Sequence, residues 1–238
     1  MDLPLSIITV VKNDYKGLVS TINSLNFVKP KRNYEHIVWI NSNSVLTKKE
    51  IEFIKKRSDL LIFEKDKGIF DAMNKALKKT KGKYILFLNA KDIFIKQFTI
   101  RKNIRPCIIP IVYSNFQKKD VFLKPKRSIA MGIPYCHQGL ILPKKDYELD
   151  SKKKFGSDYE AFLNLKLKWP LPFTSDGFIR YDTTGISSLN RWESDKATAK
   201  IIYQKFGYFY FSLFLTRSII KLIIKFIYRK ISFLFNKK

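Results

Sequence analysis

Five acidic or amide side chains that could bind a charged ligand fall within one run of 27 residues. The run reads DKGIFDAMNKALKKTKGKYILFLNAKD and joins a glycine turn, a short helical pattern, an apolar strand and a polar strand end. Ligands of open α/β sheets bind beside the carboxyl ends of the strands. The order of these segments therefore predicts that one sheet edge carries Asp66, Asp71, Asn74, Asn89 and Asp92.

The helical part of this run gathers three polar side chains on one face. Asn74 and Lys75 follow Asp71 by three and four residues, so all three are neighbours on a helix. They could bind a polar, negatively charged ligand, since a helix N-terminus also favours anions. The alternative is a solvated face in which Asp71 pairs with Lys75. The candidate ligand-binding residues of this segment are Asp66, Lys67, Gly68, Asp71, Asn74 and Lys75.

Strand patterns alternate with helical patterns through the first ninety residues. The strand patterns are short apolar runs, typical of strands buried on both faces of a parallel sheet. Thr47 and Glu50 form a capping-box pattern that begins one helix. This alternation predicts an α/β fold with a parallel, doubly wound sheet. The expected strands are Leu5–Val11, His36–Ile40, Leu60–Phe63 and Tyr84–Leu88, and the expected helices are Tyr15–Leu25, Thr47–Arg57 and Ile69–Lys79.

The pattern changes after Asp92, where apolar runs shorten and prolines become frequent. We expect one domain over residues 1–206, with halves 1–92 and 93–206, and then a tail at 207–238, where the composition shifts near Gly207. The expected elements of the second half are strands within Cys107–Tyr113 and Gly139–Leu142 and helices at Asp158–Leu167 and Leu189–Phe206.

The chain has 238 residues and a formal net charge of +26, which favours anionic partners: nucleotide phosphates, an anionic membrane or nucleic acid. Against nucleic acid, the basic residues are dispersed and no common nucleic-acid-binding motif is present. Cys107 and Cys136 allow neither a disulfide framework nor a four-cysteine zinc site. The sequence has no signal-peptide pattern, and no stretch approaches the ~18 uncharged apolar residues of a membrane span. We therefore expect a cytoplasmic protein.

The tail combines a basic stripe with a wide apolar surface. Arg217, Lys221, Lys225 and Arg229 recur every four residues, and aliphatic or aromatic residues fill most positions between them. This pattern is typical of an amphipathic helix that lies in a membrane interface, where each basic residue near an anionic leaflet contributes about 1 kcal/mol. The alternatives are a helix docked on the protein's own core and a subunit interface in a homodimer.

Several segments follow one another in the order of the motifs of a single enzyme family. They are SIITVVKND (Ser6–Asp14), EHIVWINSNS (Glu35–Ser44), DKGIFDAMNKAL (Asp66–Leu77), GKYILFLNAKD (Gly82–Asp92), CHQGLIL (Cys136–Leu142), FGSDYEAFLNL (Phe155–Leu165) and TTGISS (Thr183–Ser188). Over roughly residues 4–205 the chain resembles glycosyltransferase family 2, and within it a bacterial subgroup that builds surface polysaccharides of the colanic acid, O-antigen and capsule type. The resemblance implies the GT-A fold, a mixed and mostly parallel sheet flanked by helices.

The resemblance also implies a nucleotide site and a metal site. Asn41 stands where the family usually has an aspartate, and a lysine interrupts the acidic metal motif. Ordinary loop or helix capping is the alternative for the Asn, Thr and Asp side chains. The base and ribose would lie near Thr9, Lys12, Asn13 and Asn41, and Mg²⁺ or Mn²⁺ would be held by Asp92 and Asn89, unless the ammonium of Lys91 replaces the cation.

The family match implies that Asp158 is the base that takes the proton of the acceptor hydroxyl, with Glu160 as a second choice. The alternative for Asp158 is an N-cap. His137 and Gln138 would face the diphosphate or the acceptor, although a lone histidine in an apolar setting is more often structural. We expect His36, at the start of a strand, to be structural.

The resemblance implies an inverting glycosyltransferase, because family 2 enzymes act by direct displacement at the anomeric carbon, for which one carboxylate base suffices. It would move a sugar from a nucleoside-diphosphate sugar, with uridine diphosphate the commonest donor, to a lipid-linked glycan or a lipopolysaccharide or capsule precursor at the inner face of the cell membrane. The first alternative is a relative without activity that serves as a scaffold. The second alternative is a basic protein that binds nucleic acid.

Overall fold

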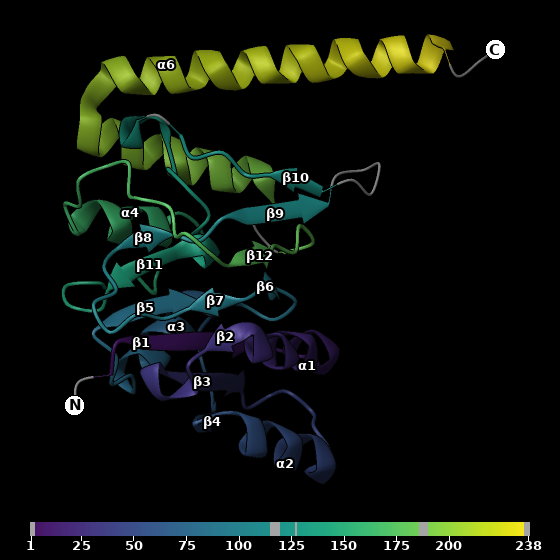
Figure 1. The fold of residues 1–238 in the computed structure, drawn as a ribbon. Helices are drawn as coiled ribbons and strands as arrows, with labels where there is room; N and C mark the ends of the chain where they lie inside the picture. Colours follow the sequence, from purple (N-terminus) through teal and green to yellow (C-terminus); the bar gives the residue numbers. More distant parts are fainter. Residues whose placement is uncertain (1–2, 115–119, 127, 186–189, 236–238) are drawn as a thin grey trace.

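The computed structural model describes residues 3–114, 120–126, 128–185 and 190–235 (Figure 1). Its central sheet contains β1 (Leu5–Val11), β3 (Tyr34–Asn41), β4 (Leu60–Glu64), β5 (Tyr84–Phe87), β8 (Cys107–Ile108) and β11 (Leu140–Pro143). The strand order is β4-β3-β1-β5-β11-β8. The first four strands are parallel, and β11 runs antiparallel to both of its neighbours. The sheet is therefore mixed and mostly parallel, as the sequence predicts.

Helices cover both faces of this sheet, and the alternation of side chains along β3 shows which helix covers which face. Val38 and Ile40 pack in one apolar cluster with residues of α1 (Tyr15–Ser24) and α2 (Lys48–Arg57). Ile37 and Trp39 belong to the main core, together with residues of α3 (Ile69–Lys78). Thr47 caps α2 with the reciprocal hydrogen bonds of a capping box, as predicted.

The second half of the chain builds a separate four-stranded sheet and also completes the first. The second sheet has the order β10-β9-β12-β6. Its members are β6 (Ile93–Lys96), β9 (Ile111–Ser114), β10 (Asp120–Phe122) and β12 (Phe178–Arg180), and a short parallel pair is formed by β2 (Val28–Lys29) and β7 (Phe98–Thr99).

The run Cys107–Tyr113 was expected within one strand, and it is divided instead. Pro110 has no N–H to donate to a ladder, and the chain changes sheets there. β8 before it pairs with β11, while β9 after it pairs with β10 and β12. The expected helix at Asp158–Leu167 is shorter, as α4 (Ser157–Asn164), and is followed by Lys166 with a left-handed φ of 50°.

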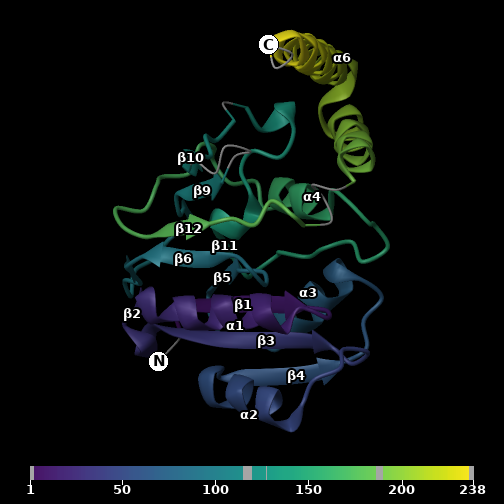
Figure 2. The ribbon, with the colours of Figure 1, turned by 90° about the vertical axis from the view of Figure 1, so that its right-hand side faces the viewer.

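The chain ends in a long helix, α6 (Arg191–Phe235), that bends at Gly207, where the backbone is not helical (φ 81°, ψ −177°). In the first segment Ala199, Ile201 and Ile202 are buried against Tyr159 of α4. The second segment crosses over the domain as an extended rod, and Figure 2 views it almost along its axis. Leu189, the expected start of this helix, lies outside the described residues. In the described part of the chain, no helix has the length and apolar character needed to cross a membrane.

Candidate active site

Three titratable side chains from distant parts of the sequence meet beyond the carboxyl end of β5. Asp92 lies in the turn after β5, His137 begins the short 3-10 helix η4 (His137–Gly139) before β11, and Asp158 lies in the first turn of α4. His137 Nδ1 is 3.2 Å from Asp158 Oδ2, and the charge of His137 also acts on Asp92. The structure therefore unites the predicted metal ligand, the predicted base and the predicted histidine.

Asp92 is a buried carboxylate in an unusual electrostatic state. Its residue is 2% exposed, and burial raises the pKa of its carboxyl from 3.8 to about 7. The hydrogen bond from Asp182 N and the charge of His137 oppose this rise in pKa, while the charge of Asp182 adds to it. Two hydrogen bonds fix it: Asp182 N donates to Asp92 Oδ1 at 2.9 Å, and Asp92 N donates to Asn89 O at 3.1 Å. A strongly perturbed pKa beside a charged partner is characteristic of functional sites.

Asp158 and His137 form a partly buried pair, and the second ring nitrogen of His137, Nε2, has no hydrogen-bond partner among the described residues. Burial alone would raise the pKa of Asp158, but the hydrogen bond and charge of His137 hold it below its ordinary value. Phe87 meets the imidazole edge-on, with ring centroids 6.0 Å apart. Among the described residues, neither His137 Nε2 nor Asn89 Oδ1 has a hydrogen-bond partner, although both atoms are buried. Because buried polar atoms are normally satisfied, these two atoms mark a place where a ligand or water would bind.

Lys91, which interrupts the metal motif, extends toward α1. It has a left-handed φ of 75°, and its Nζ is 3.3 Å from Asp14 Oδ2. Gly17 makes this path possible, because a Cβ at that position would lie 2.6 Å from Lys91 Cγ. The ammonium that could replace a metal ion is thus paired with Asp14 at the start of α1.

The candidate metal ligands are oxygen atoms of Asp92 and Asn89. The described residues contain no group of three or more His, Cys, Asp or Glu side chains that could hold a metal ion. A carboxylate oxygen and an unpartnered amide oxygen are the donors that Mg²⁺ and Mn²⁺ prefer, and Mg²⁺ commonly takes its other ligands from substrate phosphates and water. This donor set therefore fits a cation shared with a diphosphate, and it does not form a closed protein cage.

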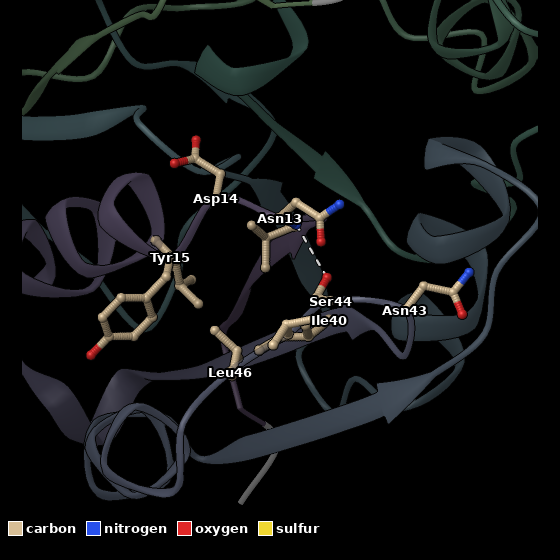
Figure 3. A pocket seen from close by; sticks show the side chains of 10 residues that line it. Asn13, Asp14, Tyr15, Ile40, Asn43, Ser44 and Leu46 are labelled. Carbon is tan, nitrogen blue, oxygen red and sulfur yellow. Dashed lines mark hydrogen bonds between the residues drawn. The ribbon is translucent and has the colours of Figure 1, made fainter.

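The loops after β1 and β3 enclose a pocket of about 390 Å³ (Figure 3). Asn13 and Ser44 stand on its rim, where Asn13 N donates to Ser44 Oγ at 3.1 Å. Asn41 is 2% exposed, and its Oδ1 accepts a hydrogen bond from Asn43 N at 3.0 Å. Its side chain therefore shapes the turn beside this pocket.

Thr9, also expected near the nucleotide, is inside the sheet. Its residue is 0% exposed, and its hydroxyl donates to Leu88 O at 2.8 Å and lies 2.9 Å from His36 Nε2. The structure thus brings Asn13 to the pocket and leaves Thr9 in the core. His36 is fully buried beside it, in keeping with the structural role expected for that residue.

The turn before α3 is held by the acids that the sequence singles out. Asp66 Oδ1 accepts from Gly68 N at 3.1 Å, and Asp71 Oδ2 accepts from Lys67 N at 2.9 Å. Lys67 and Gly68 are exposed, and a Cβ at Gly68, where φ is 135°, would meet no atom within 4 Å. The turn therefore presents backbone and a lysine to open space at the N-terminus of α3.

Lys75 and Asn74 have partners within the protein. Lys75 Nζ lies 3.4 Å from Asp71 Oδ2 and 3.2 Å from Glu64 Oε1, so the predicted pair along the helix is present. The amide of Asn74 exchanges two hydrogen bonds with the backbone of Leu149, at 2.5 and 3.0 Å. In this structure Asn74 joins α3 to the loop after β11.

Sequence reasoning missed Asp182, whose backbone N–H holds Asp92. The two residues are 90 positions apart, and no local sequence pattern predicts their contact. Thr184, in the predicted Thr183–Ser188 motif, donates its hydroxyl to Asp182 Oδ2 at 2.6 Å, while residues 186–188 of that motif lie outside the described residues. Gln138 is buried and accepts a hydrogen bond from Cys136 Sγ at 2.5 Å.

Comparison with known proteins finds a family model that matches part of the chain. Residues 6–106 match the family model described as Glycosyl transferase family 2. This stretch includes the four parallel strands and the turn that carries Asn89 and Asp92. The matched stretch is similar to glycosyltransferase family 2, in agreement with the motifs in the sequence. A search of curated proteins finds no match.

Solved structures of S. aureus TarS share the fold. TarS 1–349 in complex with UDP superimposes with a TM-score of 0.57 at 16% sequence identity, covering 84% of this chain and 65% of that chain. The complex of TarS 1–349 with UDP-GlcNAc gives 0.55 at 16% identity, covering 84% of this chain and 66% of that one. This chain spans 40% of another TarS structure. The likeness confirms the predicted GT-A arrangement of the sheet and its helices.

Proposed function

We propose that this chain is an inverting glycosyltransferase that transfers a sugar from a nucleoside-diphosphate sugar to a hydroxyl group of a glycan acceptor. The observation that carries the proposal is the approach of Asp92, His137 and Asp158 beside a family 2 domain. Beyond the carboxyl end of β5 they combine a hydrogen-bonded carboxylate with a second, buried carboxylate. A carboxylate can remove the proton of the acceptor hydroxyl, and a second carboxylate can hold a cation that offsets the charge of a departing diphosphate.

Asp158 is the proposed base. Because His137 keeps its pKa below the ordinary value, Asp158 is an ionised carboxylate at neutral pH. It would accept the acceptor's proton while the acceptor oxygen bonds to the anomeric carbon. The bond between that carbon and the diphosphate oxygen breaks in the same step, and the nucleoside diphosphate leaves. Glu160, the second choice, is paired with Lys153, which makes it less available.

Asp92 and Asn89 are the proposed ligands of a divalent cation, Mg²⁺ or Mn²⁺. When bound, the cation would offset the charge of the departing diphosphate. The unpartnered Asn89 Oδ1 supports this role, as does the backbone hydrogen bond from Asp92 N to Asn89 O, which joins the two residues in one turn. UDP is the first nucleotide to test, because UDP and UDP-GlcNAc are the ligands in the TarS complexes.

We further propose that the acceptor is a lipid-linked glycan, or a lipopolysaccharide or capsule precursor, at the inner face of a bacterial cell membrane. The second segment of α6 supports this, because it exposes large apolar side chains such as Tyr208 (72%) and Phe209 (68%). Arg217 and Lys221 on the same segment are exposed and positively charged. Such a helix suits an anionic leaflet. Pairing of two such segments in a homodimer is the alternative use of this surface.

A catalytically impaired relative that acts as a scaffold is the second candidate. The observation in its favour is the lysine within the metal motif, together with the pairing of that Lys91 with Asp14. A protein of this kind would fold normally but would neither bind a nucleotide sugar nor release its nucleotide.

Calorimetric titration with UDP and GDP, each with and without Mn²⁺, tests the proposal. We expect metal-dependent binding that is lost in Asp92→Ala, and Asp158→Asn should bind nucleotide normally while transfer falls by about 10²- to 10⁴-fold. Metal-independent binding that weakens in Lys91→Ala would assign the role of the cation to that lysine. Absence of nucleotide binding under every condition would overturn the transferase and favour the scaffold.

A further inference from the structure

A partly buried lysine lies between α6 and the loop that precedes β11. Lys126 Nζ donates to Met131 O at 3.1 Å. A Cβ built on Gly132 would lie 2.7 Å from this Nζ, 3.2 Å from Thr198 Cγ2 and 3.4 Å from Phe214 Cε2. Thr198 belongs to the first segment of α6 and Phe214 to the second. The ammonium of Lys126 is therefore enclosed at the bend of the helix.

Other cations lie close enough to Lys126 to act on its charge. Burial, followed by the charges of Arg217 and Lys221, lowers the pKa of Lys126 to about 8, and Arg191 acts in the same direction. The pKa of Lys221 is also lowered, by burial and then by Arg217 and Arg191. Asp195 opposes these charges, but it lies 3.8 Å from Arg191 and four residues along the same helix. The fold thus gathers like charges whose repulsion an anion would relieve.

The surroundings of this cluster indicate what kind of anion fits. The second segment of α6 exposes large aliphatic side chains on either side of Arg217 and Lys221, namely Leu213, Leu215, Ile219, Ile220, Ile223 and Ile224. A soluble anion would leave that apolar surface in water. An anion that carries its own hydrocarbon would cover it, because acyl chains remove apolar side chains from water.

We propose that Lys126, Arg217 and Lys221 form a binding site for the phosphate of an anionic lipid headgroup, between α6 and the rest of the domain. Guanidinium and ammonium groups are the usual ligands of phosphate, the first bidentate and the second a point charge. The site deepens the proposed membrane association, on which it rests, because it adds recognition of a phosphate to a general attraction between charges. It also fixes the orientation of the domain on the membrane, because Lys126 belongs to the domain and not to α6.

Co-sedimentation with vesicles tests this site. Full-length protein is mixed with phosphatidylcholine vesicles that contain either phosphatidic acid or oleate at equal surface charge, since oleate has a carboxylate and no phosphate. We expect tighter binding to phosphatidic acid, and a loss of about tenfold or more in Arg217→Gln/Lys221→Gln. The matched control is Lys196→Gln/Lys200→Gln, which removes the same charge from exposed positions of the same helix with the same spacing, and which should bind nearly as the wild type does.

Three results would overturn the proposal. Equal affinity for the two vesicle types would mean that no phosphate is recognised, and an equal loss in the control variant would mean that only overall charge matters. Binding of inorganic pyrophosphate in solution as tight as binding to the vesicles would assign the site to a soluble anion. Lys126→Gln gives an independent check and should weaken only the preference for phosphatidic acid.

The same preparations separate this inference from the proposed transferase. UDP titration reports on the nucleotide site, and vesicle binding reports on the cluster at the bend of α6. A protein that binds phosphatidic acid through Arg217 and Lys221 but no nucleotide would refute the transferase alone. Nucleotide binding without a preference for phosphatidic acid would refute the lipid site alone.

Discussion

Replacement of Asp92 by asparagine should stabilise the folded protein while abolishing transfer. The carboxyl of Asp92 is almost fully buried, and burial raises its pKa from 3.8 to about 7. Its ionised form is therefore disfavoured in the folded state relative to the unfolded chain. Asparagine keeps an oxygen that can accept the hydrogen bond from Asp182 N, and it carries no charge at any pH.

The size of the effect follows from the two pKa values. Each unit of pKa difference corresponds to about 1.36 kcal/mol, so full ionisation of Asp92 costs the folded state at most about 4 kcal/mol. Between pH 3.8 and 7 the folded state binds more protons than the unfolded state, so stability falls as the pH rises through this range and is constant above it. The advantage of Asp92→Asn over the wild type should thus grow by about 2 to 3 kcal/mol from pH 5 to pH 8.

Urea denaturation of both proteins at pH 5 and pH 8, without metal or nucleotide, measures this difference. UDP release in the presence of an acceptor measures the accompanying loss of transfer. Asp146→Asn, which changes an exposed carboxylate, is the matched control and should show no comparable dependence on pH. A stability difference that is the same at both pH values, or an asparagine variant less stable at pH 8, would refute the assignment of a strained, buried carboxylate to this site.

Three further changes have definite expected outcomes. Burial, followed by the charge of Lys31, lowers the pKa of His36 to about 3. Below pH 6.5 the unfolded chain therefore binds a proton that the folded chain does not, and the wild type loses stability as the pH falls. Urea denaturation of His36→Gln should show a weaker loss of stability between pH 6.5 and 4 than that of the wild type. Asn74→Ala removes both hydrogen bonds to Leu149 and should cost about 1 to 3 kcal/mol in thermal denaturation; an unchanged melting temperature would contradict this. Gly17→Ala would bring a methyl group 2.6 Å from Lys91 Cγ and should cost about 1 to 3 kcal/mol, with displacement of the lysine visible in a crystal structure of the variant.

The first half of the fold could be predicted because each of its signals is local. Leu5–Val11 is a continuous apolar run, and the structure has a strand with those bounds. The capping box at Thr47 and the glycine before α3 also act within a few residues of themselves. Local signals of this kind can be recognised in a single sequence.

The second half depends on long-range pairing that no short pattern encodes. The division at Pro110 results from which partner each short strand finds, since Ile108 pairs with Leu140 while Val112 pairs with Phe122 and Arg180. The candidate active site also depends on contacts between residues that are far apart in the sequence. Family resemblance indicated His137 and Asp158 separately, but their hydrogen bond joins residues 21 positions apart.

The sequence also could not predict which way a side chain points within a strand. Thr9 has the right residue type and lies close to the right loop, yet its hydroxyl is held between Leu88 and His36. A strand covered by helices on both faces has no solvent side, so alternation along β1 could not separate core positions from site positions.

The change of sheet at Pro110 has a consequence for how the molecule folds. The family match ends at residue 106, but the central sheet does not, because β11 covers the edge of β5 and β8 covers the edge of β11. A fragment that stopped at residue 106 would leave the edge of β5 open, and an open apolar edge invites aggregation. Residues 1–106 therefore depend on the later part of the chain to cover this edge. Any segment that replaced β11 and β8 would have to pair with β5 and cover the same edge.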